Sequence, residues 1–139
     1  MSAAQSAARE VIVDNEYATL VYYPELKIIH HVLHKPVPGQ EFRSTLNAGA
    51  EALQKYEATK WLSDDRGNGP MAQEELDWAN TDWFPRVAQA GWKFWALVVP
   101  ESMMARFALK EAVDNVYEVG VRIMAFTEPD EAMDWLTGQ

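Results

Sequence analysis

The stretch from Thr59 to Pro100 constrains the fold more than any other part of the chain. Two apolar segments, Thr59–Asp64 and Trp92–Val99, flank a turn and a segment with helical spacing. Strands joined through a helix run parallel, because the crossover returns the chain to the same end of the sheet. Trp92–Val99 is apolar apart from Lys93, which is typical of a strand covered on both faces. These features predict an α/β fold with Trp92–Val99 as an interior strand parallel to Thr59–Asp64.

Three further segments precede this unit and have the β-branched and aromatic composition of strands. They are Glu10–Asp14, Tyr17–Tyr23 and Leu26–His34. The turns between them are too short for a crossover, so we expect an antiparallel meander. Residues 1–9 are small and polar and predict a frayed tail before a single domain over residues 10–139.

Helical periodicity predicts about four helices, at Gly39–Glu57, Pro70–Gly91, after a capping Ser102, and at Glu128–Leu136. The predicted inner face of the second helix consists of Leu76, Ala79, Trp83, Val87 and Ala90. Pro85 lies inside this helix and lacks a backbone donor, which predicts a kink or division near Thr81. With a last strand at Val121–Phe126, the order is βββαβαβαβα. This order predicts a mixed, mostly parallel sheet with antiparallel N-terminal strands.

Charge and residue types exclude several classes of function. Acidic residues outnumber basic ones 21 to 12, and no Lys/Arg cluster is present, which disfavours nucleic-acid binding. The absence of cysteine excludes disulfides, thiolate zinc sites and cysteine nucleophiles. No apolar run approaches about 18 residues and the first residues do not form a signal peptide, so we expect a cytoplasmic protein without a transmembrane segment.

The histidine cluster of His30, His31 and His34 invites a metal-site interpretation that strand geometry disfavours. On a strand, His30 and His34 share a face but lie roughly 13 Å apart, while His31 points to the other face. One ion needs its ligands at about 2 Å, so we expect structural or surface histidines and predict neither metal nor cofactor.

Four motifs between Tyr17 and Leu136 carry a resemblance to a known family. They are the strand that ends in Asp64-Asp65, the helix end WFPRVAQAG, the strand WALVVP and the closing FTEPDEAMDWL. In order and spacing they resemble the SpoIIAA-like superfamily, which includes the STAS domains of anti-sigma factor antagonists and bacterial STAS-like proteins of unknown role. CRAL-TRIO lipid-binding domains share a related fold. Regulatory antagonists carry a phosphorylatable Ser or Thr where this chain has Arg66–Ala72, which contains no hydroxyl.

Asp64, Asp65 and Arg66 follow a predicted parallel strand, at the edge where open α/β sheets usually bind ligands. One interpretation is a polar pocket or a Mg²⁺ site with oxygen ligands. The alternative is an aspartate-rich turn in which Arg66 pairs locally.

Five large apolar side chains fall outside the predicted inner stripes of the second and third helices. They are Trp78, Phe84, Met103, Met104 and Phe107. We expect them to form a binding surface with Asp64–Arg66 at its rim, although a sheet covered on both faces would bury them. The leading hypothesis is a non-enzymatic STAS-like module that binds a protein partner or itself as a homodimer. The alternative is a carrier of a small apolar molecule or lipid, with a pocket between the second and third helices; an enzyme using Asp64 and Asp65 ranks third.

Overall fold

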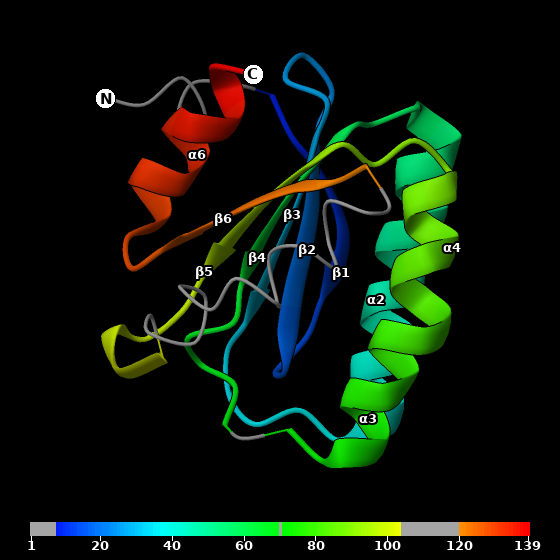
Figure 1. Ribbon diagram of the computed structural model, residues 1–139, viewed down its shortest axis with the longest axis vertical. Coiled ribbons are helices and arrows are strands. Elements are labelled where there is room, and N and C mark those ends of the chain that lie inside the picture. Colours follow the sequence, from blue (N-terminus) through cyan, green and yellow to red (C-terminus); the bar gives the residue numbers. More distant parts are fainter. Residues whose placement is uncertain (1–7, 70, 104–119) are drawn as a thin grey trace.

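The structure is a computed structural model that describes residues 8–69, 71–103 and 120–139. Its centre is a six-stranded sheet in which every strand lies beside its neighbours in the chain (Figure 1). The strands are β1 (Glu10–Asp14), β2 (Ala18–Tyr23), β3 (Ile28–Leu33), β4 (Lys60–Asp64), β5 (Phe94–Val98) and β6 (Arg122–Phe126).

The pairing confirms the predicted mixed α/β class. The strands β1, β2 and β3 form the antiparallel meander, with one bulge between Val11 and Val13. The strands β3 to β6 are parallel, and β5 lies between β4 and β6 with Trp95 opposite Trp61. The interior position expected from the apolar run of β5 is therefore confirmed.

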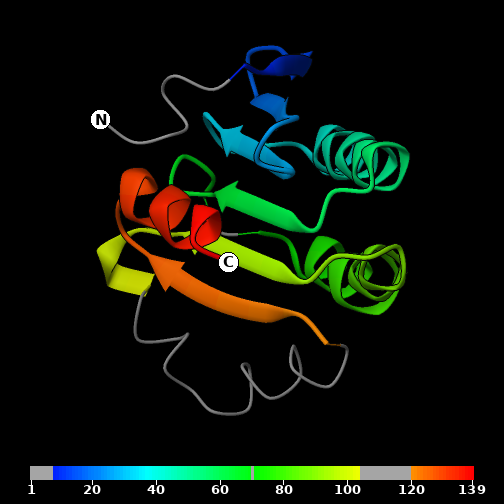
Figure 2. The same cartoon turned by 90° about the horizontal axis from the view of Figure 1, so that it is seen from above.

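Helices cover both faces of the sheet. The elements are α2 (Gly39–Tyr56), α3 (Gln73–Trp78), a π-helical turn η1 (Ala79–Trp83), α4 (Phe84–Gln89) and α6 (Pro129–Thr137). Figure 2 shows α2 and α4 on one side of the sheet and α6 on the other. The described residues thus contain three helical units, counting α3, η1 and α4 as one. The predicted third helix lies outside the described residues, apart from a short 3-10 turn at Glu101–Met103.

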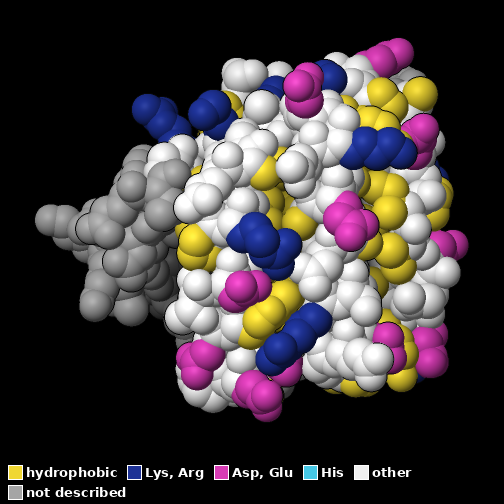
Figure 3. Space-filling view, turned by 90° about the vertical axis from the view of Figure 1, so that its right-hand side faces the viewer, with side chains coloured by type: hydrophobic (Ala, Val, Ile, Leu, Met, Phe, Trp, Pro, Cys, Tyr) yellow, Lys and Arg dark blue, Asp and Glu magenta, His cyan; other side chains and the backbone are white. Residues whose placement is uncertain are grey.

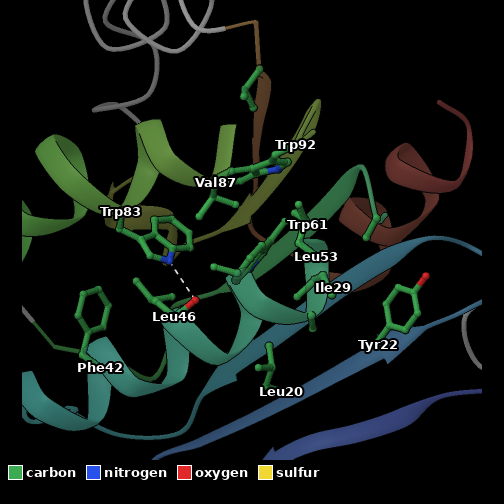
Figure 4. Close-up of a cluster of buried hydrophobic side chains, with 14 residues drawn as sticks. Leu20, Tyr22, Ile29, Phe42, Leu46, Leu53, Trp61, Trp83, Val87 and Trp92 are labelled. Carbon is green, nitrogen blue, oxygen red and sulfur yellow. Dashed lines mark hydrogen bonds between the residues drawn. The ribbon is translucent and has the colours of Figure 1, made fainter. Parts of the chain in front are cut away.

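Strand alternation divides the apolar residues into two cores. On β2, Leu20 and Tyr22 face α2, whereas Val21 and Tyr23 face the opposite side. The α2-side core contains, among others, Leu20, Tyr22, Ile29, Phe42, Leu46, Leu53, Trp61, Trp83, Val87 and Trp92 (Figure 4). The α6-side core contains Val21, Tyr23, Ile28, Leu62, Ala96, Val98, Ala132, Met133 and Leu136.

Tryptophan rings organise the α2-side core. The ring centroid of Trp61 lies 5.2 Å from that of Trp83 and 5.5 Å from that of Trp92. The indole N–H of Trp83 donates to the Leu46 carbonyl at 2.9 Å, which joins α2 to η1 (Figure 4). On the α2 side, Gly49 leaves room for Trp61, because a Cβ on Gly49 would lie 2.3 Å from the ring.

The π-helical turn corrects the predicted inner face of the second helix. Pro85 has no N–H for an ordinary helical bond, and the N–H of Phe84 instead donates to the Ala79 carbonyl, five residues earlier. This extra residue rotates the first turns, so Leu76, expected inside, is 36% exposed. Trp78 packs against the α2-side core in its place. Ala90, the residue that caps the C-terminal end of α4, is also exposed.

Candidate functional site

The acidic pair at the carboxyl end of β4 is divided between the two faces of the sheet. Asp64 is buried, and Arg66 donates to both of its carboxylate oxygens at 2.9 Å. The hydrogen bond to Asp64 raises the pKa of the Arg66 guanidinium. This is the local pairing that the sequence offered as the structural interpretation of the turn. Both carboxylate oxygens of Asp64 are therefore bonded to Arg66 within the protein.

Asp65 joins a buried chain of hydrogen bonds on the α2 side. The Trp61 indole N–H donates to His31 Nδ1 at 3.0 Å, and His31 Nε2 lies 2.7 Å from Asp65 Oδ1. Because the indole can only donate, Nδ1 accepts and Nε2 carries the proton that is donated to Asp65. His31 is 3% exposed, so this relay fixes its tautomer in the interior. Sequence reasoning placed His31 on the opposite face from His30 but did not identify either partner.

The three histidines do not converge. His34 Nε2 lies 2.7 Å from the Thr19 hydroxyl on β2, whereas His31 bonds Asp65 on the other face. Within the described ranges, no group of three or more His, Asp or Glu side chains is placed to hold a metal ion.

Trp78 contacts α2. Its ring packs edge-on against Phe42 with centroids 6.2 Å apart, and the Arg43 guanidinium lies 5.1 Å above it. This stack is the Arg43–Trp78 platform. An arginine over an indole face gains cation–π attraction in addition to packing.

Phe84 has a different set of neighbours. Its ring lies 5.2 Å from Trp92 and 5.6 Å from Trp95. Met103 is half-buried, and Met104 and Phe107 lie outside the described residues. The structure therefore brings Asp64 and Arg66 together, whereas Trp78 packs against α2 and Phe84 against the rings of Trp92 and Trp95.

An open groove runs beside the Arg43–Trp78 platform, between α2 and α3. It has a volume of about 400 Å³ and is lined by Gly39, Gln40, Arg43, Ser44, Asn47, Glu74 and Glu75. Figure 3 shows this side of the molecule, where charged side chains of both signs are interspersed with apolar ones.

Glu75 holds the platform in place. Arg43 Nε donates to Glu75 Oε2 at 2.7 Å and Nη2 donates to Oε1 at 3.3 Å, which raises the pKa of Arg43. The Glu75 side chain is 14% exposed and that of Arg43 is 35% exposed, so the ion pair is partly sheltered. The absence of a side chain at Gly39 matters here, because a Cβ there would lie 2.6 Å from Glu75 Oε1. Sequence analysis missed this pair, since the π-helical turn is what rotates Glu75 toward α2.

No family model matches the sequence, and no curated protein matches it significantly. Among the described residues, no helix has the length and apolar character needed to cross a membrane.

Proposed function

We propose that this protein is a non-enzymatic, STAS-like interaction module, which binds a protein partner or a second copy of itself through the groove between α2 and α3. The observation that carries the proposal is the Arg43–Trp78 platform at the edge of that groove. Trp and Arg are the residue types most enriched among side chains that dominate binding energy at protein interfaces. The residue resemblance to STAS domains supports the same class of function.

Preorganisation favours this surface. Arg43 is held by Glu75 and stacked on Trp78, and Trp78 is itself held by Phe42. A partner that contacts a side chain already held in place loses less conformational entropy on binding. The Arg43 side chain is 35% exposed and lines the groove together with the polar residues Gln40, Ser44, Asn47, Glu74 and Glu75.

The carboxylates that an enzyme would use are engaged in internal pairs. Asp64 is bonded by Arg66 through both oxygens, and Asp65 accepts from His31. A general base must reach a proton on the substrate, and a carboxylate that already accepts internal bonds is less suited to that role. These pairs support a structural role for Asp64 and Asp65.

A groove-blocking substitution tests the proposal. Ser44 is exposed and lines the groove, so Ser44→Arg fills it without entering the core. Gln54→Arg is the matched control, since Gln54 is exposed on the same helix about 15 Å further along its axis. Sedimentation velocity over a concentration series measures self-association. Crosslinking in the cells that express the protein, followed by affinity capture, measures partner binding. We expect Ser44→Arg to weaken association at least tenfold and Gln54→Arg to leave it unchanged.

Two results would contradict the proposal. The first is a wild-type protein that stays monomeric and captures no partner whose binding Ser44→Arg abolishes. Such a protein is not a binding module at this groove. Native mass spectrometry of the same samples tests the carrier hypothesis, because a small apolar molecule retained by both the wild type and Ser44→Arg would support a carrier instead.

A further inference from the structure

His30 occupies an unusual position at the centre of the sheet. It lies on β3, opposite Val21 of the antiparallel half and Leu62 of the parallel half. Its ring stacks at 6.2 Å on Tyr23. Val21, Leu62 and Tyr23 all belong to the α6-side core. His30 therefore borders the α6-side core, one strand away from the set β4, β5 and β6, on which α6 packs.

His30 as a whole is half-buried, but both of its ring nitrogens are buried and have no hydrogen-bond partner among the described residues. The neighbouring histidine differs, because both nitrogens of His31 are bonded, to Trp61 and to Asp65. A buried polar group without a partner costs stability, and a charged one costs far more. The neutral form of His30 is thus the one that this packing accepts.

The charged groups around His30 do not remove that cost. Asp64 on β4 favours a charged imidazole, but Arg66 already binds both of its oxygens. Arg9, before β1, and His31 both oppose a second positive charge. Tyr23 on β2 contributes its ring, and α6 contributes apolar side chains to the same core, among them Ala132, Met133 and Leu136.

We infer that His30 is an acid-sensitive switch, whose protonation loosens the α6-side core and the docking of α6 on the sheet. A protonated imidazole must reach water or a partner, which requires the apolar side chains packed against it to separate. Leu62, opposite His30, lies on a strand that α6 packs against, so its displacement weakens the docking of α6. This device is independent of the groove between α2 and α3.

The working range of the switch follows from two pKa values. Burial, assisted by His31, lowers the pKa of His30 from 6.5 to about 4. The unfolded chain therefore binds more protons than the folded one between these values, and stability present above pH 6.5 is lost as the pH falls toward 4. At pH 5 the folding equilibrium constant should fall about 30-fold relative to pH 7.5, or about 2 kcal/mol, through this group alone.

Urea unfolding at pH 7.5 and pH 5.0 tests the switch in His30→Leu, which cannot take up a proton. Between pH 7.5 and pH 5.0, the folding equilibrium constant of the wild type should fall by a factor about 30 times larger than that of His30→Leu. His34→Gln serves as the matched control, because it removes an exposed histidine and should retain the wild-type loss. Equal acid losses in the wild type and His30→Leu would overturn the inference.

A measurement on the unmodified protein keeps the inference testable if His30→Leu does not fold. The imidazole proton resonance of His30 should titrate with a midpoint near pH 4, and a midpoint near 6.5 would overturn the switch. Hydrogen exchange locates the conformational effect. After correction for intrinsic rates, amides of α6 should exchange faster at pH 5.0 than at pH 7.5, whereas unchanged α6 protection would refute the loosening.

Discussion

Adding a methyl group at Gly49 should reverse the effect that a Gly-to-Ala change normally has in a helix. Gly49 lies inside α2, where alanine ordinarily stabilises by about 0.5–1 kcal/mol. Here the new Cβ would lie 2.3 Å from Cη2 and 2.7 Å from Cζ2 of Trp61, where ordinary contact begins at 3.4 Å. The shortfall of about 1 Å must be absorbed by the helix or by the ring.

The ring has little freedom to move. Trp61 is fully buried, bonded through its indole N–H to His31, and flanked by the rings of Trp83 and Trp92. Overpacking a well-filled core costs about 1–3 kcal/mol, and this enclosure favours the upper end of that range. Subtracting the gain in helix propensity leaves a net loss of about 2 kcal/mol for Gly49→Ala.

Urea denaturation followed by tryptophan fluorescence measures the loss. With a slope of about 2 kcal/mol per molar urea, the midpoint should fall by about 1 M. Gly138→Ala is the control, since its Cβ would meet its nearest atoms at an ordinary 3.6 Å. In a Trp61→Phe background the cost of Gly49→Ala should shrink, because the atoms it meets are gone. A Gly49→Ala protein as stable as the wild type would refute the packing of α2 on Trp61.

Two further predictions concern the cores. Leu97 is 5% exposed on the interior strand β5, so Leu97→Ala should cost on the order of 2–5 kcal/mol in urea unfolding; a loss below about 1 kcal/mol would place it outside the core. His31→Leu leaves the buried Trp61 N–H and the Asp65 carboxylate without their partner, and should cost about 1–3 kcal/mol at pH 7.5. His30→Leu removes no described hydrogen bond and should therefore cost less stability at pH 7.5 than His31→Leu. If the two variants lost equal stability, the hydrogen-bonded relay through His31 would be contradicted.

The sheet was predictable because its determinants are local. Short turns required antiparallel pairing in the first half, and intervening helices required parallel pairing in the second. The near-continuous apolar run of β5 indicated cover on both faces, as found. These patterns depend on residues close together in the chain, so the sequence alone carries them.

The phase of the second helix was less predictable. Pro85 predicted an interruption near Thr81, and the π-helical turn at Ala79–Trp83 is that interruption. A kink leaves the direction of side chains around the helix axis nearly unchanged. An inserted residue rotates every earlier turn about that axis relative to the turns that follow. For that reason Leu76 emerged at the surface and Trp78 packed inward. The cue was present in Trp78 itself, a large apolar residue outside the expected stripe.

The polar contacts of the site depend on register and crossing geometry between distant segments. The bond between Trp61 and His31 joins β4 to β3, and the pair of Arg43 and Glu75 joins α2 to α3. Composition cannot specify which residues of two elements meet. Only the pair of Asp64 and Arg66, two residues apart, was within reach of sequence reasoning.

The sequential order of the six strands has a consequence for how the chain assembles as it is synthesised. Each strand finds its sheet partner in the segment made just before it, so loop closure stays short and assembly can proceed from the N-terminus. The last element is the exception. The helix α6 returns over β4, β5 and β6, and the Lys60 ammonium donates to the Gln139 carbonyl across 79 positions of the chain. Until residues 129–137 have been synthesised, one face of β4 and β5 lacks α6, and the apolar side chains on that face are open to aggregation.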